Sequence, residues 1–164
     1  MTEKEMFLNS FEKEFETTMR VLNAYPGDKP NFRPHPQSRS ALELAWNFEE
    51  EERLIVGGAF LGDVVYKQNT PPGTLDEVKR EYQSTHRDLS VKLKGLPDTA
   101  FNEIITFGSG AEHPIPMRRG DALWLAVMDA VHHRGQFSVY IRMTGGKVPS
   151  IYEPLVDKSV LPKE

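Results

Sequence analysis

The segment from Thr2 to Leu22 reads TEKEMFLNSFEKEFETTMRVL and carries the pattern that decides the fold. Thr2 is followed three residues later by Glu5, and a hydroxyl and a carboxylate at this spacing satisfy free amides at a helix start. Apolar side chains then repeat every three or four residues and form one stripe, as expected of a helix that packs on one side. The stripe consists of Phe7, Phe11, Phe15, Met19 and Leu22. We therefore predict a helix over residues 3–24, ending before Pro26.

The same start signal occurs twice more along the chain. Ser40 precedes Glu43 and Thr74 precedes Glu77, and each pair opens a stretch with helical apolar spacing. A fourth amphipathic stretch ends at Gly145. The remaining three helices are expected at residues 40–57, 75–94 and 119–144.

The connections between these helices limit how they are arranged. Residues 26–38 contain four prolines, which suggests an extended crossing over the domain, and the connection after the second helix is also long. Four amphipathic helices joined in this way favour an all-α four-helix bundle and disfavour simple up-down-up-down wiring. We expect irregular loops at 97–117, with a brief strand at Ile104–Phe107, and an ordered C-terminal tail, Val148–Pro154, along the bundle.

Length and composition restrict the class of protein. A chain of 164 residues suits one domain, so residues 1–164 are assigned to a single domain. The chain has no cysteine, which excludes disulfides, zinc fingers and a cysteine nucleophile. A net charge of −4 gives no general attraction to nucleic acid or an anionic membrane, and no apolar run is long enough to span a bilayer. The acidic N-terminus does not resemble a secretion signal, so we expect a cytoplasmic protein with no nucleic-acid or membrane partner.

Two pairs of polar residues interrupt the apolar pattern. Asn47 and Glu51 lie four residues apart on the second helix, and Asp129 and His133 lie four apart on the last helix. Residues at this spacing share a helix face, and metal sites in bundle cores are built from such pairs on facing helices. The other interpretation is that Asn47 and Glu51 are solvated at the edge of the stripe among their acidic neighbours.

Two segments resemble a known family. Residues 129–142, DAVHHRGQFSVYIR, followed by GGKVPSIY at 145–152, closely resemble the C-terminal helix of the DinB family (damage-inducible protein B-like). Residues 44–51, LAWNFEEE, resemble its second helix, and the resemblance covers nearly the whole chain in order and spacing. It implies a four-helix bundle with up-up-down-down wiring, a homodimer and a divalent-metal site.

The resemblance also implies which residues hold the metal. The family site uses three histidines, one from the second helix and two, four residues apart, from the last helix. The matching positions are Asn47, Asp129 and His133, so only His133 keeps the histidine. Asp129 offers an oxygen ligand suited to a hard cation and Asn47 a weaker carbonyl ligand. Glu51, one turn beyond Asn47, could restore a carboxylate as a ligand or act as a catalytic general base. Nickel, zinc and manganese are the expected metals if one is retained.

Two functions remain open at this stage. One is a metalloenzyme, a thiol-dependent transferase or a metal-assisted hydrolase, that acts on an unknown small molecule. The other is a non-catalytic, stress-associated bundle that has lost its metal and keeps a polar cluster that fixes helix register.

Other residues bear on assembly and on the remaining histidines. The apolar residues Phe60, Leu61, Val64 and Val65 are candidates for the contact surface of a homodimer. His86 is placed on the polar side of the third helix, where we expect it to be solvated.

Overall fold

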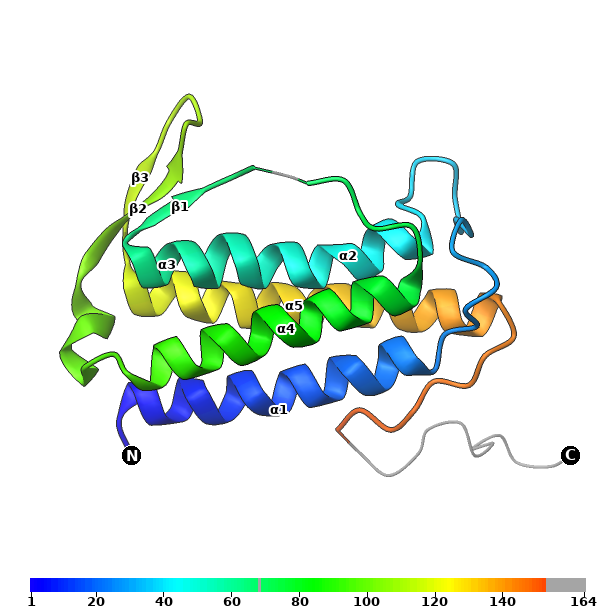
Figure 1. The fold of residues 1–164 in the computed structure, drawn as a ribbon, viewed down its shortest axis with the longest axis horizontal. Helices are drawn as coiled ribbons and strands as arrows, with labels where there is room; N and C mark the ends of the chain where they lie inside the picture. The colour runs from blue at the N-terminus through cyan, green and yellow to red at the C-terminus, as the bar shows by residue number, and fades with distance from the viewer. Residues whose placement is uncertain (68, 153–164) are drawn as a thin grey trace, which may run out of the picture.

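Four long helices form the body of the molecule in the computed structural model, which describes residues 1–67 and 69–152 (Figure 1). They are α1 (Glu3–Asn23), α2 (Ala41–Glu51), α4 (Leu75–Lys94) and α5 (Arg119–Met143). The start signals at Thr2, Ser40 and Thr74 are all present as reciprocal capping boxes. The predicted all-α bundle is therefore confirmed, and three helix starts are set by local sequence.

The direction of the helices differs from the expected up-up-down-down order. In Figure 1 the chain runs from left to right in α1, from right to left in α2 and α4, and from left to right in α5, which is an up-down-down-up order. Glu3 at the start of α1 binds Arg118 at the start of α5, with 2.7 Å between Oε2 and Nη1, as parallel helices require. The connection after α1 turns the chain over at one end of the bundle. Only the connection between the second helix and α4 runs back along the bundle's length, so α2 and α4 are parallel.

The second helix is longer than the predicted 40–57. From α2 it continues through a π-helical turn, η1 (Glu52–Val56), into α3 (Gly57–Leu61), and ends at Gly62 with a φ of +90°. Gly58 does not end the helix. A Cβ there would lie 2.8 Å from the carbonyl oxygen of Asp63, so glycine is needed because the following strand passes close by.

A small sheet covers one end of the bundle. It consists of β1 (Asp63–Val65), β2 (Ile104–Ser109) and β3 (Ile115–Arg118), with β1 parallel to β2 and β2 antiparallel to β3. The strand predicted at Ile104–Phe107 is thus confirmed and is longer than expected. A short 3₁₀ helix, η2 (Asp98–Asn102), precedes it.

The core has two apolar clusters, one toward each end of the bundle. Arg134 is fully buried and binds Glu14 of α1 and Tyr152 of the tail. Val148 is buried, so the described part of the predicted tail does lie against the bundle; Glu153 and Pro154 fall outside the described residues.

Within the described chain, no helix combines the length and apolar character needed to cross a membrane.

The expected apolar contact surface after the second helix is divided. Val64 is fully buried and Phe60 packs on the core, whereas Leu61 and Val65 are exposed. These four residues therefore do not form one continuous exposed patch.

Candidate metal centre

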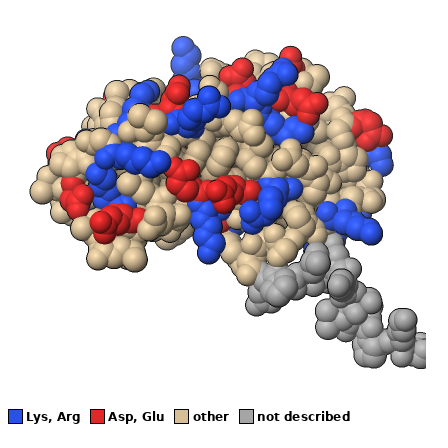
Figure 2. All heavy atoms as spheres, turned by 60° about the horizontal axis from the view of Figure 1, so that its bottom comes forward, with Lys and Arg blue, Asp and Glu red and all other residues tan. Residues whose placement is uncertain are grey.

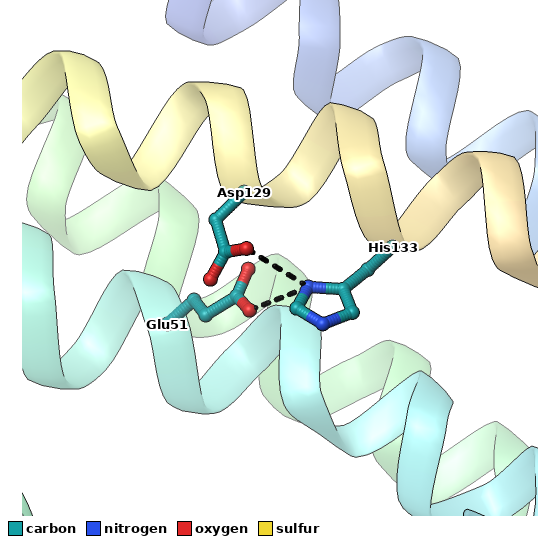
Figure 3. Close-up of side chains that lie close together, drawn as sticks. All are labelled: Glu51, Asp129 and His133. Atoms are coloured by element: carbon teal, nitrogen blue, oxygen red, sulfur yellow. Dashed lines mark ion pairs between the residues drawn. The ribbon is translucent and has the colours of Figure 1, made fainter. Parts of the chain in front are cut away.

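Three ligand-capable side chains meet between α2 and α5: Glu51, Asp129 and His133 (Figure 3). One donor atom from each lies within 4.8 Å of the donors of the other two. The Nδ1 atom of His133 is 2.8 Å from Oε1 of Glu51 and 3.6 Å from Oδ1 of Asp129. Two carboxylates and an imidazole therefore converge on one point.

The backbone explains this convergence. Asp129 and His133 are one turn apart on α5, so both side chains point to the same side. Glu51 is the last residue of α2, and the π turn begins directly after it. Because α2 and α5 run antiparallel, Glu51 lies opposite the pair on α5 (Figure 3). Single π turns inside α-helices are frequent at functional sites.

Asn47 lies beside the triad. Its Nδ2 atom donates to Oε1 of Glu51 and is 3.2 Å from Nδ1 of His133. The structure thus places Asn47, Asp129 and His133 together, as expected from their spacing, but Glu51 lies in the centre of the group. The alternative in which Asn47 and Glu51 are solvated is wrong, because they are 9% and 7% exposed.

Burial dominates the electrostatics of Glu51. It raises the pKa of this carboxyl to about 7; the nearby charge of Asp129 adds to the rise, and the hydrogen bond to His133 opposes it. For His133, burial alone would lower the pKa, but the hydrogen bond and charge of Glu51 outweigh it and raise the pKa. Without a cation, both side chains of this pair therefore have a raised pKa.

The residues present fit a divalent cation. Oε2 of Glu51 is buried and has no hydrogen-bond partner among the described residues, although such atoms are nearly always paired. Carboxylate and imidazole ligands together suit manganese and zinc, and imidazole also suits nickel. A cation beside Glu51 would supply the partner that this oxygen lacks.

Two hollows border the cluster. One of about 460 Å³ is lined by His133, Gln136 and Tyr140, among others. The other, of about 320 Å³, is lined by Asn47, Trp46 and Glu50, among others. Ser38 and Arg39 line both. Arg39 could not be identified from the sequence, because a lone arginine in a proline-rich loop carries no spacing signal.

A second histidine lies in the core and not at the solvated position predicted for it. His86, expected to be solvated, is 4% exposed. Its ring binds Glu52 on one side and Glu12 on the other. These partners lie in distant segments of the chain, so the sequence around His86 gives no sign of its burial.

Comparisons with known proteins agree with this architecture. The chain matches the DinB family over residues 1–163. It is 26% identical over 150 residues to the uncharacterized protein YrdA of Bacillus subtilis, covering 90% of this chain and 87% of that protein. Among solved structures, a DinB-like protein from Bacillus cereus superposes with a TM-score of 0.77 at 24% identity, covering 90% of this chain and 97% of the other. The DinB-like protein YjoA of Bacillus subtilis has a TM-score of 0.72 at 17% identity, covering 91% and 99%.

Proposed function

Since the chain belongs to the DinB family, we propose that it is a divalent-metal protein whose centre is formed by Glu51, Asp129 and His133. The observation that carries the proposal is the buried, unpartnered Oε2 of Glu51 within the convergent group. Structural pairing alone would leave each buried oxygen with a donor. Manganese, zinc and nickel are the metals we expect.

We assign a role to each residue of the centre. Asp129 would bind through a carboxylate oxygen and His133 through Nδ1, the ring atom that faces both carboxylates. Asn47 orients Glu51 through its Nδ2 hydrogen bond. When bound, the cation supplies Lewis-acid chemistry by lowering the pKa of a coordinated water or thiol. Glu51 would bind the cation through Oε2 and is also the proposed catalytic residue, because its other oxygen, Oε1, lies in the same cluster and can accept a proton from a substrate at the centre.

The reaction class proposed is metal-assisted hydrolysis or thiol-dependent transfer on a small molecule. The support is the position of the centre, which borders two hollows through His133 and Asn47. Small-molecule sites place a few polar groups so that they converge on the ligand, as the polar groups of the centre do here.

The decisive experiment is metal analysis of protein purified without a histidine tag or nickel resin. We expect about one equivalent of metal in the wild type after incubation with manganese, zinc or nickel, and its loss in Asp129→Ala. His132→Ala is the matched control, since His132 is exposed and binds Gln136, outside the centre. A folded wild type that takes up none of the three metals would contradict the proposal.

That contradictory result would favour the second candidate, a non-catalytic, stress-associated bundle. One observation supports it: the cluster of His86, Glu52 and Glu12 ties three helical segments together. The chain therefore already uses buried polar groups for structure, and the Glu51 cluster could do the same.

We also propose that the chain forms a homodimer through the outer face of α5. Apolar side chains stay exposed along this helix at spacings that place them on one side. They are Leu125, Met128, Val139 and Met143. Gly135 lies between them, and a Cβ there would meet no atom within 4 Å, so a second α5 could approach closely. We expect sedimentation equilibrium to give a molecular mass of twice 18.7 kDa for the wild type. The double variant Met128→Glu, Val139→Glu should have half that mass. A monomeric wild type at micromolar concentration would contradict the proposal.

Nucleic acid is not among the proposed partners. On the face shown in Figure 2, basic and acidic side chains are intermixed and form no basic stripe. Duplex binding depends on such a stripe. We expect no gel shift with duplex DNA at physiological ionic strength. A tight, salt-sensitive shift would contradict this.

A cytoplasmic location stays a prediction.

A further inference from the structure

Arg39 belongs to the walls of both hollows beside the proposed metal centre. It directly precedes Ser40, the N-cap of α2, and lines both hollows. His133 lies in the wall of one hollow and Asn47 in the wall of the other. The wall of either hollow therefore combines Arg39 with a residue of the Glu51 cluster.

The charge of Arg39 is not neutralised by the described part of the protein. Within residues 1–67 and 69–152, no side chain or backbone group forms a hydrogen bond or ion pair with its guanidinium. The side chain is exposed. Arg33, in the wall of the same hollow, is different: its Nη2 atom is 2.9 Å from Oε2 of Glu43. One arginine is thus paired and the other is free.

The acidic groups nearby already have partners. Glu43 binds Arg33 and the backbone of Ser40. Glu50 accepts a hydrogen bond from the backbone N–H of Asn69 at 2.7 Å and lies 3.6 Å from the Arg53 guanidinium. Both acidic side chains in the wall of this hollow therefore already have partners.

The backbone of Arg39 is held in place although its side chain is free. The hydroxyl of Tyr140 donates to the carbonyl oxygen of Arg39 at 2.8 Å. The capping box of Ser40 and Glu43 fixes the next residue. A free cation on a fixed backbone loses less conformational entropy on binding than one on a mobile loop.

We propose that Arg39 is the anion-binding residue of the substrate site, and that the substrate is a small molecule carrying a carboxylate. The carboxylate would bind the Arg39 guanidinium through two parallel hydrogen bonds, a geometry that arginine favours. The other end of the molecule would reach the metal centre. This inference rests on the proposed function, because it names the substrate class for that centre.

A pair of probes that differ only in charge tests the inference. Cobalt-loaded protein is titrated with 3-mercaptopropionate or 3-mercapto-1-propanol, and binding is followed by visible absorption. We expect the wild type to bind the carboxylate probe about tenfold more tightly, as a charge-assisted hydrogen bond predicts. Arg39→Gln should bind the two probes equally. Lys92→Gln is the control: it removes one charge from a separate hollow and should keep the preference.

A second titration separates this inference from the proposed function. Metal-free protein is titrated with succinate by calorimetry, comparing the wild type with Arg39→Gln. If no metal binds but succinate binding depends on Arg39, the proposed function fails and the anion site stands. If metal binds but the two thiol probes bind equally to the wild type, the anion site is overturned and the metal centre stands.

Discussion

Two adjacent glutamates, Glu51 and Glu52, each face a histidine, but the clusters they form differ in how completely their polar atoms are paired. The two oxygens of Glu52 lie 3.0 and 3.1 Å from Nδ1 of His86. Nε2 of His86 lies 3.2 Å from Glu12, and the ring stacks on Phe15 with centroids 3.7 Å apart. We call this group, with Ser90, which donates to Glu12, the closed cluster.

We call the second group the open cluster; it consists of Asn47, Glu51, Asp129 and His133. It also pairs carboxylates with a histidine, but its polar atoms are less completely paired. The His133 side chain is 13% exposed against 5% for His86. Oε2 of Glu51 has no partner among the described residues. A fully paired polar network rigidifies a core, whereas an unpaired buried atom marks a place where a partner is missing. The contrast suggests a structural role for the closed cluster and a binding role for the open one.

The largest expected effect is on stability at the closed cluster. His86→Ala removes one partner of the buried Glu52 carboxyl and the ring stacked on Phe15. Breaking such a buried pair costs about 3–5 kcal/mol, so we expect the free energy of unfolding to fall by this amount. His133→Ala should cost less, about 1 kcal/mol, because it removes one hydrogen bond to Glu51 from a partly exposed ring. Urea denaturation of metal-free protein measures both, and equal losses would break the distinction between the clusters.

The next effect is the pH dependence of the open cluster. Folding raises the pKa of Glu51 from an ordinary 4.5 to about 7. A raised carboxyl pKa favours the folded state at low pH, and this contribution is lost as the pH rises from 4.5 to 7. Above pH 7 the loss approaches about 3 kcal/mol.

Glu51→Gln should therefore match the wild type at pH 4.5 and be the more stable protein at pH 8 when metal is absent. Urea denaturation across this range measures the difference. His86 and the rest of the closed cluster are the same in both proteins, so the difference reports on Glu51 together with His133, whose pKa Glu51 raises. A constant difference from pH 4.5 to 8 would show that burial does not disfavour the charged carboxylate.

Metal addition should stabilise a variant of the closed cluster but not a variant of the open cluster. The expected change in the free energy of unfolding is somewhat smaller than the pH effect. A cation at about a hundredfold excess over its dissociation constant stabilises the wild type by about 2.7 kcal/mol. Asp129→Ala should lose this response, since it removes one ligand of the open cluster. Glu12→Gln, which alters only the closed cluster, should keep it. The shift of the thermal midpoint with added zinc measures all three, and a lost response in Glu12→Gln would contradict the assignment.

The helices could be predicted from the sequence because their signals are local. Three capping boxes and the apolar stripe placed α1, and the starts of α2 and α4, within a residue of the structure. The direction of the helices could not be predicted, because it depends on how connections pack at the bundle ends. The end of the second helix was predicted too early for a related reason. Glycine is required at position 58 because β1 approaches closely there, and this tertiary contact does not end the helix.

The open cluster could be predicted in part. Two pairs with a four-residue spacing indicated Asn47, Glu51, Asp129 and His133, because such pairs share a helix face. The closed cluster was missed because Glu12, Glu52 and His86 come from three separate segments and no spacing links them. Glu51 was singled out by its four-residue spacing from Asn47, whereas no spacing indicated that Glu52 faces a buried histidine.

The smallest predicted effect is a gain of affinity in the open cluster. Asn47 has its Nδ2 atom 3.2 Å from Nδ1 of His133, so a ring nitrogen at this position would lie near the proposed cation. Imidazole is a better ligand than an amide for zinc and nickel. We expect Asn47→His to bind these metals about tenfold more tightly, or about 1.4 kcal/mol, measured by competition with a chelator. Asn47→Gln, which keeps an amide, should show no gain. An unchanged affinity in Asn47→His would mean that Asn47 only orients Glu51, and that the open cluster binds its cation through three residues.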